Sequence, residues 1–196
     1  MAETRRLVAD LGGVAFHFDH AHRLARLAAR CGLPAERIDA LLWKSGFSAA
    51  CDEGRYGSAA EMRAAIRAIL DFPGRDADLD DDWCSAFRPD RAVIALLGDA
   101  ALFTNNGPLE EEALPRLHPA AFERFEPLFF SYRLGCRKPD PAAFAAMSAR
   151  LGSPPIVFVD DSAANVTAAK TAGWHAVRYL GLAGLRRDLQ EAGFAR

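Results

Sequence analysis

Short apolar runs separated by polar loop residues recur along the chain. Each run is only three or four residues long, too short for a helix, and a polar or charged residue comes directly after it. Runs of this length and composition are typical of buried strands. The pattern predicts strands at residues 7–9, 101–103, 128–130, 156–159 and 175–177.

Segments of helical length lie between the later runs. Residues 141–151 and 163–172 carry apolar side chains at three- and four-residue spacing, and Gly173 ends the second segment. Alternation of strands and helices along a chain favours a parallel sheet covered by helices. We therefore predict an α/β fold with a parallel-sheet core.

The interval from about residue 20 to residue 88 has a different pattern. Apolar residues recur at helical spacing throughout it, and no convincing strand is present. We therefore expect a helical insertion after the first strand. In this division, residues 1–14 and 89–196 form the α/β core domain, and residues 15–88 form a small α-helical cap packed over one edge.

Length, composition and charge limit the class of protein. The chain has 196 residues, of which 51% are hydrophobic and 26% charged, as in a soluble globular protein with one substantial core. A formal charge of −2 gives no basic face for nucleic acid or an anionic membrane, and no apolar stretch is long enough to span a bilayer. We expect a cytoplasmic monomer or homodimer. Buried thiols, rather than a disulfide or zinc site, are predicted at Cys31, Cys51, Cys84 and Cys136.

Polar residues follow the predicted strands at the edge where such sheets place their sites. Asp10 follows the first run, Thr104 and Asn105 follow the second, and Asp160 follows the fourth. Lys138 comes shortly before the helix predicted at residue 141. Because the working crevice of an open α/β sheet lies beyond the carboxyl ends of its strands, we expect these segments to meet there.

The residue types at this edge favour a metal ion and a phosphoryl group. Asp10, Asp160 and Asp161 would repel one another without a cation among them, and oxygen ligands without His or Cys favour Mg²⁺. Lys138 would offset the charge of an anionic substrate. With the Thr104 hydroxyl and the N–H groups of two glycine-rich turns, these residues form a cradle suited to phosphate.

Asp10 is the candidate nucleophile within this cradle. Gly12 and Gly13 follow it and let the backbone approach a phosphate closely. A carboxylate placed there can form an aspartyl-phosphate that water later hydrolyses.

Four segments resemble, in order and spacing, the motifs of the haloacid dehalogenase-like (HAD) hydrolase superfamily. They are residues 10–14, 104–106, 138–140 and 160–165. The chain is most similar to the branch with a small helical cap, which includes glucose-1-phosphatases and the N-terminal phosphatase domains of soluble epoxide hydrolases. Residues 52–54, Asp-Glu-Gly, are similar to a cap motif of that branch. The resemblance implies a Rossmann-like core.

The resemblance also implies roles for the residues that bind phosphate. Asp10 would be the nucleophile, and Thr104 and Asn105 would contact the phosphate. Lys138 would steady both the nucleophile and the phosphate. The glycine turn at Gly13 would lie against the same group.

The metal ligands are implied in the same way. Asp161 would ligate Mg²⁺ directly, and Asp160 would ligate it or hold its waters. The carbonyl of Gly12 would supply a further ligand beside Asp10. Asn165 would support the geometry of Lys138 or Asp161.

Gly12 departs from the family pattern. Most phosphatases of the superfamily carry there a second aspartate that protonates the leaving alcohol and activates water. One explanation is a substrate whose leaving group needs little protonation, such as a hexose 1-phosphate. A second is that His17 or His20 substitutes as proton donor and acceptor, although both histidines also suit a hinge or surface position without chemistry.

These observations predict a Mg²⁺-dependent phosphatase acting on a small phosphorylated metabolite, such as a sugar phosphate. A 2-haloacid dehalogenase is an alternative, since its aspartate attacks carbon and no halide needs a proton. Gly12 at a position that is usually Tyr in that class, and the Asp160-Asp161 pair, argue against it. A catalytically silent phosphate-binding or regulatory protein is the other alternative.

Three further features have structural interpretations. The five aspartates within residues 76–82 are expected on a solvated loop and the first turn of a helix. Trp43, Phe47 and Tyr56 either line a substrate pocket or form the small core of the insert. Asp140 is expected to cap the helix that follows it.

Overall fold

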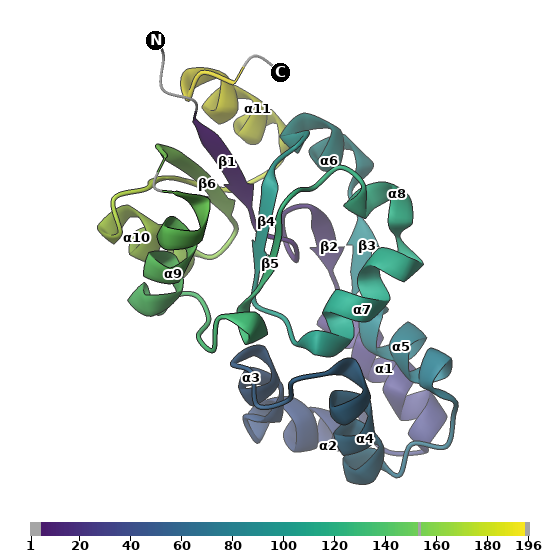
Figure 1. Ribbon diagram of the computed structural model, residues 1–196. Coiled ribbons are helices and arrows are strands. Elements are labelled where there is room, and N and C mark those ends of the chain that lie inside the picture. The colour runs from purple at the N-terminus through teal and green to yellow at the C-terminus, as the bar shows by residue number, and fades with distance from the viewer. Residues whose placement is uncertain (1–4, 153, 195–196) are drawn as a thin grey trace.

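The computed structural model describes residues 5–152 and 154–194. Its centre is a parallel sheet of five strands in the order β5-β4-β1-β6-β7 (Figure 1). All five predicted strands are present, which confirms the α/β fold with a Rossmann-like parallel sheet. Residues 1–4 and 195–196, the outer ends of the predicted core ranges, lie outside the described residues. The strands are β1 (Arg6–Ala9), β4 (Ala101–Thr104), β5 (Leu128–Phe130), β6 (Ile156–Asp160) and β7 (His175–Arg178).

The strand register brings the predicted site segments to one edge. Ala9, the last residue of β1, pairs with Leu102 of β4 on one side and with Val159 of β6 on the other. Asp10 therefore leaves the sheet at the same level as Asp160, which ends β6. Parallel pairing thus places residues distant in sequence at one carboxyl-end edge.

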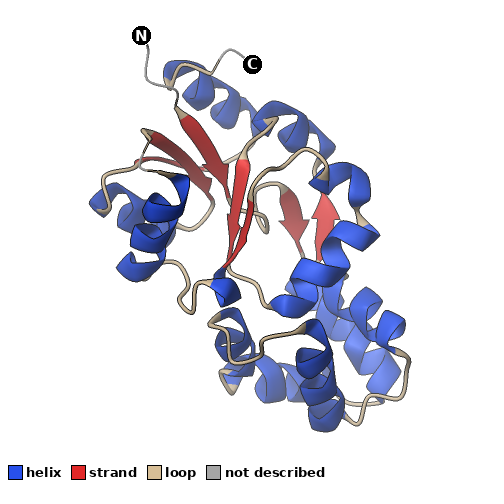
Figure 2. Ribbon diagram, viewed as in Figure 1, coloured by secondary structure: helices blue, strands red, loops and turns tan. Residues whose placement is uncertain are grey.

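One face of the sheet packs against an aromatic cluster. Side chains alternate along a strand, so Val8, Phe103 and Phe158 point to the same face. Phe144 and Trp174 complete the cluster, and their rings meet edge to face with centroids 5.3 Å apart. The helices on this face are α9 (Pro141–Leu151) and α10 (Ala163–Thr171), shown in Figures 1 and 2.

The opposite face carries a second and larger core. Leu7, Ala9, Leu102 and Val159 point into it, and it continues into the helices at the end of the sheet. Continuity of the apolar core makes the sheet and those helices pack as one body. The helices packed on this side and the turns beside them are α6 (Arg91–Leu97), α7 (Pro108–Leu117), α8 (Pro119–Phe122), α11 (Leu182–Glu191) and η2 (Ser131–Arg133).

A helical segment lies beyond the carboxyl ends of the strands (Figure 1). It follows β1 in the chain and returns to the sheet before β4, in the interval where helical periodicity was predicted. It packs against α7 through α4 and α5. Its elements are α1 (His20–Cys31), α2 (Ala35–Asp39), η1 (Ala40–Lys44), α3 (Phe47–Asp52), α4 (Ala59–Leu70) and α5 (Asp76–Cys84).

Two short strands connect the sheet to this helical segment, and sequence analysis missed both. β2 (Phe16–Phe18) pairs antiparallel with β3 (Phe87–Pro89). The expectation that no strand occurs within about residues 20–88 was wrong at the end of that interval, where β3 begins at Phe87. Three-residue strands that include His17 and Arg88 lack the apolar run that identifies a buried strand.

Local sequence explains where several helices begin. Ser58 Oγ accepts from the Glu61 backbone N–H at 3.3 Å, and the Glu61 carboxylate accepts from the Ser58 N–H at 3.2 Å, which forms a capping box for α4. Asp140 caps α9 as predicted, because its carboxylate accepts from the Ala142 N–H at 2.8 Å.

The aspartates of α5 are only partly solvated. Asp80 and Asp82 are 3% and 1% exposed, so the prediction of a solvated cluster was wrong for these two. Asp80 accepts from Arg63 Nε at 2.7 Å and from Arg116 Nη2 at 2.8 Å. Arginines on α1, α4 and α7 supply the partners, and their proximity cannot be seen in the sequence order.

The cysteines are all free thiols, but only two of them are buried. Cys51 and Cys84 lie in the core, whereas Cys31 and Cys136 are half-buried. None of the helices in the described ranges is both long and apolar enough to cross a membrane.

Candidate active site

A buried cluster of charges lies at the carboxyl ends of β1 and β6. Lys138 is 1% exposed, and its Nζ lies 2.9 Å from Asp10 Oδ1 and 2.8 Å from Asp160 Oδ2. The same ammonium group donates to the Phe103 carbonyl at 2.7 Å. Each of its three N–H donors thus has an acceptor, and Lys138 links three strand ends.

The cluster is electrostatically strained without a further cation. Burial raises the pKa of Asp10 to about 6, and Asp160 raises it too, although Lys138 opposes both. Burial lowers the pKa of Lys138, but the two carboxylates outweigh burial and leave it above its ordinary value. Lys138 is therefore charged, and it does not fully compensate the two acids beside it.

Asp160 is fixed by several donors. Its Oδ1 accepts from the Ser162 N–H at 2.9 Å and from Asn165 Nδ2 at 3.0 Å, and Asn165 Nδ2 also lies 3.0 Å from Oδ2. Asn165 therefore contacts Asp160, whereas the resemblance implied support of Lys138 or Asp161. Ser162 is also the N-cap of α10, so the helix start and the site depend on the same turn.

Three carboxylates form a group suited to a metal ion. Asp10, Asp160 and Asp161 each offer an oxygen, and these oxygens lie within 4.8 Å of one another. Burial and the neighbouring Asp160 raise the pKa of Asp161, which indicates that a cation would be favourable there. Hard oxygen donors of this kind fit Mg²⁺.

The glycine turn after Asp10 fits closely around this group. Gly13 has φ of 83°, and a Cβ there would lie 2.3 Å from Asp161 Oδ2, so only glycine fits. A Cβ at Gly12 would lie 3.3 Å from the Phe87 ring and 3.5 Å from Phe18. The two rings take up the space beside residue 12, where the family pattern has an aspartate.

The segment after β4 positions a hydroxyl and the lysine loop. Thr104 is 2% exposed, and its Oγ1 accepts from Asn106 Nδ2 at 2.7 Å, which leaves the hydroxyl proton to donate elsewhere. Asn105 Nδ2 donates to the Lys138 carbonyl at 2.8 Å, and Asn105 Oδ1 accepts from the Lys138 N–H at 2.9 Å. The Asn105 side chain thus holds the lysine loop, in addition to facing the cavity.

A cavity of about 310 Å³ connects this cluster with the helical segment. Gly13, Asp160 and Asp161 are not in its wall. Sequence-predicted residues that line it are Asp10, Gly12, Thr104, Asn105, Lys138 and Asn165. Lining residues that the site prediction did not include are Phe18, Arg23, Trp43, Ser48, Ala49, Asp52, Phe87, Asn106, Glu110 and Arg137.

The two histidines of the sequence analysis do not line this cavity. His17 has a side chain that is 51% exposed, and its Nε2 lies 3.4 Å from Asp90. His20 Nε2 lies 3.3 Å from Asp39 on the far end of α2. The structure therefore does not bring His17 to the phosphate cradle.

The aromatic residues of the insert divide between the two suggested roles. Trp43 lines the cavity. Phe47 and Tyr56 pack on each other with ring centroids 5.7 Å apart and line a separate hollow. No signal in the sequence separates these roles, because the direction of each side chain depends on how the helices pack.

The charged lining residues Arg23, Asp52 and Glu110 were not predicted as site residues for the same reason. They come from α1, α3 and α7, which meet only in the folded chain. Burial, together with Glu110, raises the pKa of Asp52 well above its ordinary value. The cavity therefore contains acids and a cation beyond the predicted cradle.

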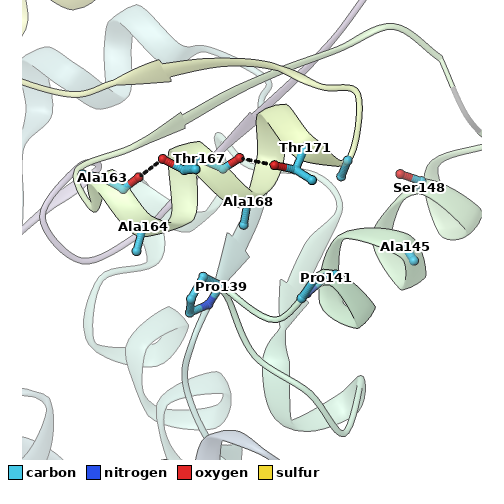
Figure 3. Close-up of a pocket in the computed structure, with 10 residues that line it drawn as sticks. Pro139, Pro141, Ala145, Ser148, Ala163, Ala164, Thr167, Ala168 and Thr171 are labelled. Atoms are coloured by element: carbon cyan, nitrogen blue, oxygen red, sulfur yellow. Dashed lines mark hydrogen bonds between the residues drawn. The ribbon is translucent and has the colours of Figure 1, made fainter.

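A larger hollow of about 760 Å³ lies between α9 and α10 (Figure 3). Prolines, alanines, one serine and two threonines line it. Thr167 and Thr171 donate to the carbonyls of Ala163 and Thr167 within their own helix. A wall of this composition offers no acid, base or nucleophile of the kind found at the strand ends.

Comparisons with known proteins bear on the fold and on the family that the chain resembles. Residues 91–173 match the family model of haloacid dehalogenase-like hydrolases. No curated protein matches the chain. The family match and the fold confirm the resemblance to HAD-like hydrolases and the prediction of a hydrolase.

Solved structures share the fold over nearly the whole chain. A HAD-like family hydrolase from Porphyromonas gingivalis is 24% identical, with a TM-score of 0.78, and the match covers 96% of this chain and 99% of that one. A HAD family enzyme from Bacteroides thetaiotaomicron, in complex with magnesium and inorganic phosphate, is 21% identical, with a TM-score of 0.70 and coverage of 89% and 93%. L-2-haloacid dehalogenase from Xanthobacter autotrophicus is 20% identical, with a TM-score of 0.61 and coverage of 97% and 84%.

Proposed function

We propose that the protein is a Mg²⁺-dependent phosphatase of a small phosphorylated metabolite, a sugar phosphate such as a hexose 1-phosphate. The observation that carries the proposal is the buried bridge from Lys138 to Asp10 and Asp160 at the strand ends. A similar fold in complex with magnesium and inorganic phosphate supports it.

Asp10 acts as the nucleophile in this proposal. Lys138 holds Asp10 Oδ1 at 2.9 Å and leaves the second carboxylate oxygen to attack phosphorus. A bond forms between that oxygen and phosphorus as the ester P–O bond breaks, and the leaving oxygen takes a proton from water to become the alcohol. Water then attacks the same phosphorus, releases inorganic phosphate and restores the Asp10 carboxylate.

Other residues bind and orient the phosphate. Lys138 and the Thr104 hydroxyl offer positive charge and a proton donor to its oxygens, and the turn at Gly13 lets the backbone approach. Asn105 keeps Lys138 in place through two backbone hydrogen bonds. Positioning of this kind accounts for most of the catalysis of phosphoryl transfer.

Asp10, Asp160 and Asp161, with the Gly12 carbonyl, would hold the metal ion. When bound, Mg²⁺ supplies positive charge that stabilises negative charge on the transferred phosphoryl group. Asn165 and Ser162 keep Asp160 oriented for this role.

The helical segment supports a role as a cap. We propose that residues 15–88 cover the site, exclude water during attack by Asp10 and contact the leaving group. Arg23, Trp43 and Asp52 of this segment line the same cavity as Asp10. The short β2–β3 pair is the connection through which the cap would move.

Replacement of Asp10 tests the proposal. Asp10→Asn keeps the shape of the side chain but removes the nucleophile, so hydrolysis of p-nitrophenyl phosphate should fall by about 10⁴-fold or more. A chelator should lower wild-type turnover by at least about 10²-fold. Asp76→Asn is the matched control, because the Asp76 side chain is 66% exposed and far from the cavity wall.

Either of two results would reject part of the proposal. Turnover retained by Asp10→Asn would overturn the nucleophile assignment. Wild-type turnover that is unchanged by the chelator would reject the role of Mg²⁺. A panel that includes glucose 1-phosphate and glucose 6-phosphate then tests whether Gly12 is explained by a leaving group that needs little protonation. A preference for the 6-phosphate would contradict that explanation.

A 2-haloacid dehalogenase is the second candidate, and buried Arg23 in the cavity is the observation in its favour, because a cation there suits a carboxylate. A solved dehalogenase of similar fold carries covalently bound chloropropionic acid. Chloride release from 2-chloropropionate separates this candidate from a phosphatase. If neither ester nor haloacid reacts, a silent phosphate-binding protein becomes the leading alternative.

A further inference from the structure

Arg23 is a buried cation in the cavity wall with unused hydrogen-bond donors. It lies on α1, is 3% exposed, and lines the same cavity as Asp10. Within the described residues, its Nε and Nη2 have no hydrogen-bond partner. A buried charged donor without a partner is costly, so such a group is expected to meet a ligand.

Aromatic rings surround the guanidinium group. Its Cζ lies 5.3, 5.4, 5.2 and 5.3 Å from the ring centroids of Phe18, Trp43, Trp83 and Phe87. Cation–π attraction to these faces keeps the charge tolerable in the core. The rings do not replace the oxygen acceptors that the N–H groups prefer, so Arg23 is held in place and left available to bind.

Glu110 presents a complementary group in the same cavity, beside the Trp83 ring that Arg23 also contacts. It is 3% exposed and lies on α7, in the sheet domain. Its Oε1 accepts from Trp83 Nε1 at 2.6 Å, and its buried Oε2 has no hydrogen-bond partner in the described part of the chain. Burial raises the pKa of Glu110, and Arg23, Trp83 and the backbone N–H groups of Glu110 and Gly107 oppose that shift. Arg23 and Glu110 form no ion pair with each other there, so a donor and an acceptor both remain open.

We propose that Arg23 and Glu110 form a subsite for the hydroxyl groups of the leaving alcohol. A hydroxyl oxygen accepts from the Arg23 guanidinium, and a hydroxyl proton is donated to Glu110 Oε2. The inference rests on the proposed phosphatase function and names its substrate class, a polyhydroxylated phosphate monoester. Arg23 and Glu110 are specificity-determining residues in this assignment.

The same cavity disfavours a leaving group with a second negative charge. A carboxylate or a second phosphate would meet Arg23, but the Glu110 carboxylate lines the cavity too and would oppose it. Phe18 and Trp43 offer apolar faces that suit the C–H surface of a sugar ring. The cavity volume of about 310 Å³ is that of a small-molecule site.

Two variants test the subsite. Arg23→Met keeps an apolar side chain among the rings, and Glu110→Gln keeps an oxygen acceptor for Trp83. For each, kcat/KM is measured with glucose 1-phosphate, glucose 6-phosphate and p-nitrophenyl phosphate, whose leaving group has no aliphatic hydroxyl. We compare kcat/KM for the better sugar phosphate with kcat/KM for the aryl phosphate. We expect the ratio of the two values to fall by about 10- to 100-fold in each variant.

Arg26→Met is the matched control on the same helix. Arg26 is partly exposed, pairs with Asp82 at 2.8 Å and does not line the cavity. The control should keep the wild-type preference for the sugar phosphate. An equal loss on sugar and aryl phosphates in Arg23→Met and Glu110→Gln, or no loss, would overturn the subsite. A preference for 2-phosphoglycolate that depends on Arg23 would overturn the polyol assignment.

Binding measurements separate this inference from the proposed function. If the wild type hydrolyses none of the esters, the phosphatase proposal fails, and calorimetry with the sugar phosphates and inorganic phosphate still tests the subsite. We expect the wild type to bind the sugar phosphate more tightly than phosphate and each variant to lose that difference. The subsite would be contradicted if the wild type bound the sugar phosphate and inorganic phosphate with equal affinity. It would also be contradicted if both variants kept the wild-type difference between these two affinities. Melting temperature identifies a variant that fails to fold, in which case the other variant decides.

Discussion

Two buried cations face the same cavity with opposite surroundings. Lys138 has an acceptor for each N–H, from Asp10, Asp160 and the Phe103 carbonyl. Arg23 has aromatic faces around it but no acceptor for Nε or Nη2 in the described ranges. Burial removes both groups from water. Of the two, Lys138 regains a full set of oxygen acceptors from the protein, and Arg23 does not.

The difference separates a cation whose donors are all satisfied within the protein from a cation that awaits a ligand. Lys138 and the acids beside it are fixed by the sheet, so the nucleophile is oriented before any substrate arrives. Arg23 lies on α1, a helix of the segment proposed as a cap. In the proposed subsite it distinguishes one leaving group from another. We interpret the sheet edge as the chemical part of the site and the helical segment as the selective part.

Removal of Lys138 should have the largest effect. Lys138→Met leaves Asp10 and Asp160 buried without their counter-charge, and we expect the free energy of unfolding to fall by about 3–5 kcal/mol. Urea unfolding without divalent ions measures this. Lys44→Met is the control, because Lys44 is 70% exposed in its pair with Asp39 and such a pair contributes about 1 kcal/mol or less. A loss below about 1 kcal/mol in Lys138→Met would contradict the assigned role.

Metal binding should stabilise the folded protein by a smaller amount. At a Mg²⁺ concentration about 100 times its Kd, the free energy of unfolding should rise by about 2.7 kcal/mol. Asp161→Asn should lose most of the increase, since it removes one of three carboxylates without disturbing the buried pair. The melting temperature with and without Mg²⁺ measures this, and an equal increase in wild type and variant would reject Asp161 as a ligand.

The titration of Asp10 gives a pH dependence of stability with a definite sign. Its pKa of about 6 in the folded, metal-free protein lies above the ordinary value of 3.8, so the folded state holds a proton that the unfolded state has lost. The contribution of Asp10 to stability is therefore greatest below pH 3.8 and decreases as the pH rises to about 6.

The difference in unfolding free energy between wild type and Asp10→Asn isolates this contribution. Measured without divalent ions, the wild type should lose stability relative to the variant between pH 4 and pH 6, within the window set by 3.8 and about 6. A difference that stays constant or rises across this window would show that the pKa of Asp10 is not raised in the folded protein.

His17 should give the smallest effect. Its exposed side chain pairs with Asp90 and lies outside the cavity wall, so His17→Gln should change kcat/KM by less than about threefold. A decrease in kcat/KM of about 10²-fold would instead support His17 as the proton donor, an alternative that the sequence left open.

The sequence predicts the sheet edge far better than the helical segment. Asp10, Lys138 and Asp160 follow or precede short apolar runs, and parallel pairing dictates where such residues meet. Arg23 and Glu110 lie on helices whose periodicity shows which face is buried but not what it is buried against. Their meeting depends on how α1 and α7 each pack against α5, which helical periodicity does not encode.

Gly12 illustrates the same limit on a smaller scale. The sequence shows that an aspartate is missing there, and the structure shows Phe87 and Phe18 beside the position. β2 and β3 bring these rings in, and strands of three residues give no recognisable apolar pattern.

Direct detection of phosphorylated Asp10 tests the central claim. Wild-type protein with Mg²⁺ and a phosphate ester is quenched in acid during the first turnover, and the peptide that contains Asp10 is analysed by mass spectrometry. We expect that peptide to gain the mass of one phosphoryl group in the wild type and none in Asp10→Asn. Product release during the same turnover with an unmodified Asp10 peptide would contradict the claim.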